Sequence, residues 1–133
     1  MNTHSLTHAE KALFTAHHLL TITYPLSGEN KLFIPIIRHL HTAYLYSIRS
    51  FTTKHSFNQF VKKHKVSKEI LTTQEALREL LEHYTTSTIT FSRKENYILC
   101  DMDYNLQTIN PSLLHTYLRT TQEFIQFLKG VPC

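Results

Sequence analysis

Glycine is scarce in this sequence, with two copies in 133 residues, and tryptophan is absent. Turn-rich β-sandwiches and flexible tails both need more glycine than this. Only four prolines and no low-complexity tract are present, which also argues against a disordered chain. Apolar residues make up 41% of the sequence, and 133 residues are enough for one domain with its own core. We therefore expect a single domain over residues 1–133.

The sequence also lacks a long apolar run and a secretory leader. The first residues have neither a basic start nor the apolar stretch that a leader needs. The longest run without charge, residues 12–28, contains two His, three Thr and Pro25, so it is too polar to span a membrane. The two cysteines form no disulfide framework. We expect a cytoplasmic protein with no membrane partner.

Metal ligands are numerous but poorly spaced. The cysteines have no metal-ligand spacing, and two glycines cannot build a glycine-rich phosphate loop. His4 and His8 have i,i+4 spacing, but we place His4 before the first helix begins. Two other histidine pairs, one and two residues apart, diverge on a helix: His17/His18 and His39/His41. We expect no metal and no other cofactor.

One acidic cluster resembles the start of a calcium-binding loop. Asp101, Asp103 and Asn105 match its first three ligand positions. The sixth and twelfth positions, which require Gly and Glu, hold Leu106 and Ser112. We therefore expect these aspartates to support turns.

Apolar periodicity predicts a long central helix over residues 31–51, whose apolar face is wide enough to need neighbours on more than one side. A capping box at Thr7–Glu10 predicts the start of a preceding helix. That helix should end near Tyr24, because Pro25 follows. Asn30 is the expected N-cap of the central helix, and the short link predicts an antiparallel pair.

The second half predicts two more helices and a hairpin. A capping box at Thr72 predicts a helix to about Tyr84. The Thr- and Ile-rich segments of residues 87–101 predict a β-hairpin, and 106–109 adds a short strand. Asn110-Pro111 predicts the start of a last helix that ends near Lys129. The expected fold is mainly α: an antiparallel four-helix bundle with a small β-hairpin between the third and fourth helices.

The segment from Arg78 to His83 (RELLEH) resembles the Arg-x4–6-His motif of the HEPN superfamily, whose members are compact helical bundles that often form dimers. Many of them cleave RNA without a metal, with Arg stabilising phosphate charge and His assisting proton transfer. The resemblance implies these roles for Arg78 and His83. Glu79 departs from the polar residue that the family often carries after the Arg, and it would compete with a phosphate for the site at the guanidinium. The stretch from Phe91 to Tyr104, with YPL at 24–26, also resembles small helical proteins of archaeal type.

Charge is distributed unevenly along the chain. Residues 1–68 carry nine Lys or Arg and two Glu, a balance of +7, whereas residues 69–133 carry five basic and eight acidic residues, a balance of −3. The basic candidates for binding nucleic acid or an acidic partner are Lys62, Lys63, Lys65, Lys68, Arg93 and Lys94. Phe57 and Phe60 lie near the lysines and would stack on bases. A solvated linker and an ordinary charged turn are the alternative interpretations.

These patterns leave three functions open. We place first a non-catalytic binding or assembly module that self-associates, with RNA or a ribonucleoprotein as partner. The alternative is a metal-independent HEPN-type ribonuclease that uses Arg78 and His83. A structural subunit of a larger complex is the third, and it requires a large exposed apolar patch.

Overall fold

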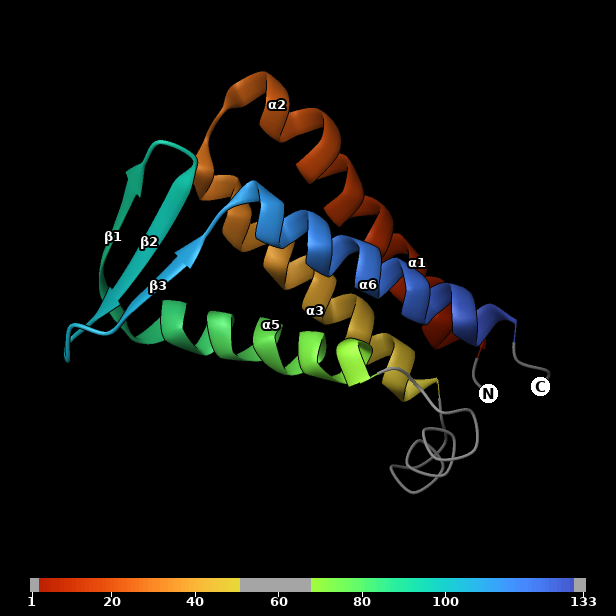
Figure 1. Cartoon of the computed structure of the whole chain (residues 1–133). Helices are drawn as coiled ribbons and strands as arrows, with labels where there is room; N and C mark the ends of the chain where they lie inside the picture. Colours follow the sequence, from red (N-terminus) through yellow and green to blue (C-terminus); the bar gives the residue numbers. More distant parts are fainter. Residues whose placement is uncertain (1–2, 51–67, 131–133) are drawn as a thin grey trace.

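The computed structural model describes residues 3–50 and 68–130, which form helices beside a small sheet (Figure 1). The helices and strands are α1 (Thr3–His18), α2 (Tyr24–Ser27), α3 (Phe33–Arg49), α5 (Lys68–Thr86), β1 (Ser87–Arg93), β2 (Asn96–Asp101), β3 (Leu106–Ile109) and α6 (Pro111–Lys129). The strands pair antiparallel in the order β1-β2-β3. The mainly helical class is confirmed.

The central position of α3 is also confirmed. It packs on α1, α5 and α6, and Figure 1 shows it running antiparallel to α1 and α5. Its buried residues are Phe33, Ile34, Ile36, Ile37, Leu40, Ala43, Tyr44 and Ser47. Leu45, an apolar residue of the same helix, is exposed. Burying each large aliphatic side chain stabilises the fold by roughly 1.5–3 kcal/mol, so the wide face of α3 accounts for much of the core.

The predicted start of the first helix is wrong. α1 begins at Thr3, so Thr7 and Glu10 lie inside the helix and do not cap it. Leu6, upstream of the expected cap, packs against the buried core. This packing favours a helix that starts earlier than the local capping signal indicates.

The predicted end of that helix near Tyr24 is wrong as well. A π-helical segment over Leu19–Thr23 leads directly into α2, in which Pro25 occupies the first turn. The Tyr24 N–H donates to the Leu19 carbonyl, five residues back. The change from i,i−4 to i,i−5 hydrogen bonding therefore occurs just before Pro25, which has no N–H to donate. The helical course ends only at Gly28, whose φ of +67° is left-handed.

The predicted N-cap role of Asn30 is also wrong. Asn30 begins a 3-10 turn over Asn30–Leu32, and the α-helix proper starts at Phe33. Pro35 therefore lies in the first turn of α3, where its missing N–H has no helical partner to lose. The Asn30 side chain is buried and bonds to the hairpin turn and to Tyr24 instead.

The start predicted from the second capping box is wrong too, because α5 begins at Lys68 and Thr72 lies within it. Ile70, upstream of the expected start, is buried in the core. Phe57 and Phe60, which were expected to stack on bases, lie outside the described residues.

The strands are as predicted, but the expected position of the β-hairpin, between the third and fourth helices, is wrong. The β1–β2 hairpin has the predicted bounds, and β3 adds a strand at Leu106–Ile109. Because the π-helical segment Leu19–Thr23 separates α2 from α1, the sheet follows the fourth α-helix of the described chain, α5. Its inner face buries Tyr97, Leu99 and Ile109 in the same core as the helices.

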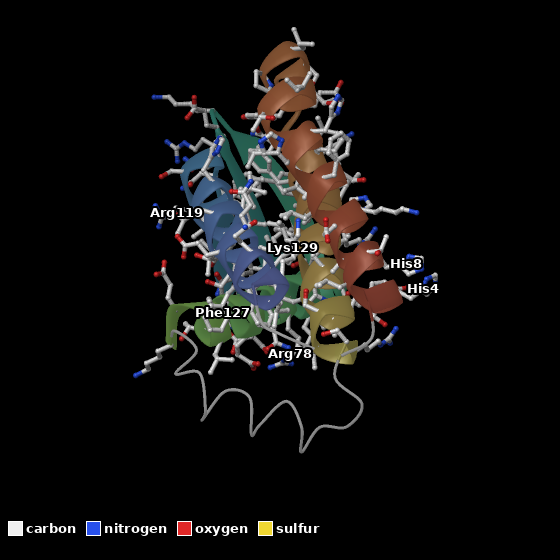
Figure 2. All side chains as sticks on the ribbon, turned by 90° about the vertical axis from the view of Figure 1, so that its right-hand side faces the viewer. His4, His8, Arg78, Arg119, Phe127 and Lys129 are labelled. Atoms are coloured by element: carbon white, nitrogen blue, oxygen red, sulfur yellow. The ribbon has the colours of Figure 1, made fainter. Side chains whose placement is uncertain are left out.

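The start and end of α6 are as predicted. Asn110 is the N-cap, and its Oδ1 accepts from the Leu113 N–H at 2.9 Å. Pro111 takes the first helical position. At the other end, Lys129 Nζ lies 3.6 Å from Glu10 Oε2 and joins α6 to α1. Figure 2 views the molecule from the side where α1 and α6 lie next to each other.

Candidate functional site

Arg78 lies on the exposed surface of α5, between two carboxylates. Its guanidinium bonds to Glu75 and to Glu82, one turn to either side. These hydrogen bonds raise the pKa of Arg78 above its ordinary value. The hydrogen bond between Arg78 and Glu75 also lowers the pKa of Glu75. Glu79 was expected to compete for the guanidinium, but Glu75 and Glu82 hold it. Two of the five N–H donors of the guanidinium are therefore engaged by carboxylates, whose negative charge opposes the approach of a phosphate.

His83 occupies the C-terminal part of the same helix and faces the sheet. Its side chain is 16% exposed, and its Nε2 lies 3.6 Å from Asp101 Oδ2. Ser87 Oγ lies 3.4 Å from His83 Nδ1 and donates to the His83 carbonyl at 2.6 Å. Because the shorter bond satisfies a helix-end carbonyl, this Ser–His–Asp group joins the end of α5 to β2 and does not present a free nucleophile.

Arg78 and His83 are not brought together among the described contacts. Five residues on an α-helix correspond to a rotation of about 140°, so the two side chains leave α5 in different directions. Arg78 contacts carboxylates along its own helix, whereas His83 contacts the sheet. The geometry therefore favours structural roles for both residues.

Asp101 supports a turn, as predicted for this acidic cluster. Its carboxylate accepts from the backbone N–H groups of Asp103 and Asn105, both at 2.9 Å, and from Asn105 Nδ2 at 3.1 Å. The Asn105 N–H contributes most to holding the pKa of Asp101 below its ordinary value, and His83 adds to the effect. In residues 3–50 and 68–130, no three His, Cys, Asp or Glu side chains gather as metal ligands.

The predicted basic residues lie in separate places. Lys62, Lys63 and Lys65 are outside the described residues. Lys68 is the exposed first residue of α5. Arg93 and Lys94 lie at the tip of the β1–β2 hairpin, where Lys94 takes a φ of +57° and its carbonyl accepts from Asn30 Nδ2 at 2.8 Å.

Sequence reasoning missed the free edge of the sheet. β1 pairs with β2 on one side only, and Figure 1 places it at the margin of the molecule, away from the helices. Six of its seven residues are exposed. The sequence offered one signal for this edge: a β-branched run whose only charge is Arg93. Edge strands are normally protected by charges, prolines or short length, and this run has little such protection.

The register shows that apolar side chains cover one face of this sheet. Phe91 pairs with Ile98, while Ile89 and Leu106 both pair with Cys100. Paired residues share a face, so this outer sheet face consists of Ile89, Phe91, Ile98, Cys100 and Leu106. Ile89, Phe91 and Leu106 are exposed to solvent.

A second apolar surface is the groove between α1 and α6. Its apolar lining consists of Leu13, Phe14, Ile125 and Phe127. Phe14 is 70% exposed. The charged residues Glu10, Glu123 and Lys129 also line the groove.

Within the described segments, no helix is both long enough and apolar enough to cross a membrane. Comparisons with protein families, with curated proteins and with solved structures give no match. The HEPN resemblance therefore remains a prediction, and function must be argued from the geometry.

Proposed function

We propose that this chain is a non-catalytic binding and assembly module that pairs with a second copy of itself through β1. The observation that supports the proposal is the exposed edge of β1, which carries one charge, at Arg93, and offers unpaired backbone N–H and C=O groups along one side. Such an edge is a template for another strand. The antiparallel order of the four long helices is compatible with the HEPN-like bundle that we propose as the fold.

The sequence of β1 suits antiparallel pairing with itself. A two-fold axis at Thr90 places Ile89 of one copy opposite Phe91 of the other, twice. Aromatic and β-branched residues form favourable cross-strand pairs of roughly 0.2–1 kcal/mol each. The single charge, Arg93, then faces Ser87 of the second copy, so no like charges oppose one another. We place the contact at β1 and not in the groove between α1 and α6, because a strand edge offers backbone donors and acceptors in addition to apolar side chains.

A one-strand interface is small, so we expect a dimer that forms only with increasing concentration. Stable interfaces bury at least about 1,000 Å² in total, and one added strand is at the lower end of that range. Sedimentation velocity between about 5 and 500 μM covers the range in which such a weak dimer changes its population.

Paired charge substitutions provide a matched test. In the Ile89→Lys/Phe91→Lys variant, lysine faces lysine across the axis, and we expect a monomer at all concentrations. In the Ile89→Glu/Phe91→Lys variant, glutamate faces lysine, and we expect the dimer to return. Both variants alter the same two exposed positions, so a general effect on folding would affect them alike. Equal behaviour of the two variants, or a wild-type chain that stays monomeric, would refute the β1 contact.

RNA or a ribonucleoprotein is the partner that we propose for the basic residues. Arg93 and Lys94 at the hairpin tip are both exposed, and in the described part of the chain neither takes part in the observed ion pairs, which supports access for a phosphate. We expect single-stranded RNA to bind more weakly as salt rises, and Arg93→Ala/Lys94→Ala to reduce that salt dependence. Absence of binding at low salt would remove RNA from the proposal and leave self-assembly intact.

The ribonuclease hypothesis receives less support from the contacts of the described residues. Arg78 is engaged by Glu75 and Glu82, and His83 is directed toward Asp101. We retain it as the alternative that an RNA cleavage assay tests directly.

A further inference from the structure

His4 and His8 lie one turn apart on α1, and their side chains converge. The Nε2 atoms of the two rings are 3.2 Å apart, and the rings stand at 89° to each other. Figure 2 shows both side chains on the outer side of α1. The sequence-based prediction placed His4 before the helix and so rejected the pair. Because α1 begins at Thr3, both residues are helical, and their i,i+4 spacing brings the rings together.

The distance between the two nitrogens matches a shared metal ion. Two imidazole nitrogens bound to Zn²⁺ at 2.0–2.1 Å with a tetrahedral angle lie about 3.3 Å from each other. In a square-planar Cu²⁺ or Ni²⁺ site, neighbouring ligands at similar bond lengths lie about 2.9 Å apart. The observed 3.2 Å lies between these values. We infer that His4 and His8 chelate one divalent transition-metal ion through their Nε2 atoms.

The surroundings of His8 hold its ring in position. The ring stacks on Tyr46 of α3 with centroids 5.1 Å apart and an angle of 26°. The guanidinium of Arg49 lies 5.4 Å from the centroid of the same tyrosine ring. Because stacking already fixes the His8 ring, metal binding costs less conformational entropy. The nearby positive charge of Arg49 lowers the affinity for a metal cation.

The described residues supply two ligands, so water or an exchangeable ligand would fill the other coordination positions. Across the described residues, no third His, Cys, Asp or Glu joins the pair. Structural zinc sites are closed by four protein ligands, so a two-histidine site binds its ion reversibly and leaves it accessible. This inference does not depend on the proposed self-association.

Calorimetric titration of the full chain with ZnCl₂ and with NiCl₂ tests the inference. The titration is run near pH 8, where metal ions compete with fewer protons for imidazole. We expect one ion per chain for the wild type. His4→Gln, which changes an exposed residue, should lower the affinity at least about tenfold, a loss typical of damage to a metal site.

The His17→Gln/His18→Gln variant is the matched control, because it removes two exposed histidines of the same helix whose side chains diverge. It should bind as the wild type does. Zinc should also shift the Nε2 resonances of His4 and His8 in long-range ¹H–¹⁵N spectra. Equal loss in both variants, no loss in His4→Gln, no saturable binding, or one ion per two chains would overturn the assignment.

Discussion

Asn30→Asp is a substitution that separates two roles for one residue. As an N-cap, Asn30 would tolerate Asp, because Asn and Asp cap helices equally well. In the structure, Asn30 Oδ1 instead accepts from the Tyr24 hydroxyl at 3.0 Å, and its Nδ2 donates to the carbonyls of Lys94 at 2.8 Å and Asn96 at 3.4 Å. Asp can accept from Tyr24 but cannot donate to either carbonyl.

The expected magnitude follows from these bonds. Each is worth about 1 kcal/mol, so Asn30→Ala should lower the free energy of unfolding by roughly 2–3 kcal/mol. Asp should lower it by about 3 kcal/mol, because a carboxylate in a buried position would face the Lys94 and Asn96 carbonyls. Urea unfolding followed by circular dichroism measures both changes.

Asn110→Asp is the control, since Asn110 is a true N-cap and its side chain accepts from the Leu113 N–H. We expect that variant to change the free energy of unfolding by less than about 0.5 kcal/mol. If Asn30→Asp were as stable as Asn110→Asp, the bridge between the first helical hairpin and the β-hairpin would not contribute as argued.

Three further outcomes follow from the structure. Leu99→Ala, in the fully buried centre of the sheet, should lower the free energy of unfolding by about 2–5 kcal/mol, whereas the exposed Met102→Ala should leave urea unfolding nearly unchanged. The lowered pKa of Asp101 stabilises the fold fully above the unfolded-state pKa, which is about 4, and this contribution is lost as pH falls through the folded-state pKa. Asp101→Asn should therefore unfold with less acid sensitivity, and an unchanged pH profile would contradict this account. Finally, we expect no RNA cleavage in EDTA by the wild type, and cleavage that His83→Ala abolishes would establish the ribonuclease alternative.

Much of the fold could be predicted because local signals and tertiary packing agree there. The Asn110-Pro111 start of α6 and the strands at 87–101 and 106–109 are examples. The helix starts at Thr7 and Thr72 were wrong because Leu6 and Ile70, which lie upstream of these signals, pack into the core.

The candidate sites were harder to predict, because they depend on positions that pattern alone does not determine. The relative directions of Arg78 and His83 follow from helix geometry, but their partners across the chain do not. The convergence of His4 with His8 depended on a helix start that the capping signal placed four residues too late. The free edge of β1 becomes visible only when the strand order is known.

Disulfide trapping at Thr90 tests the central claim most directly. The proposed axis places the two Thr90 residues opposite each other, with Cα atoms about 4.5–5.5 Å apart, a distance that a disulfide can bridge. In a Cys133→Ser background, where the remaining native thiol is the buried Cys100, Thr90→Cys should form a covalent dimer under mild oxidation. Ser92→Cys should not, because its counterpart would lie about 13 Å away along the strand. Failure to trap Thr90→Cys, or equal trapping at both positions, would contradict self-assembly through β1.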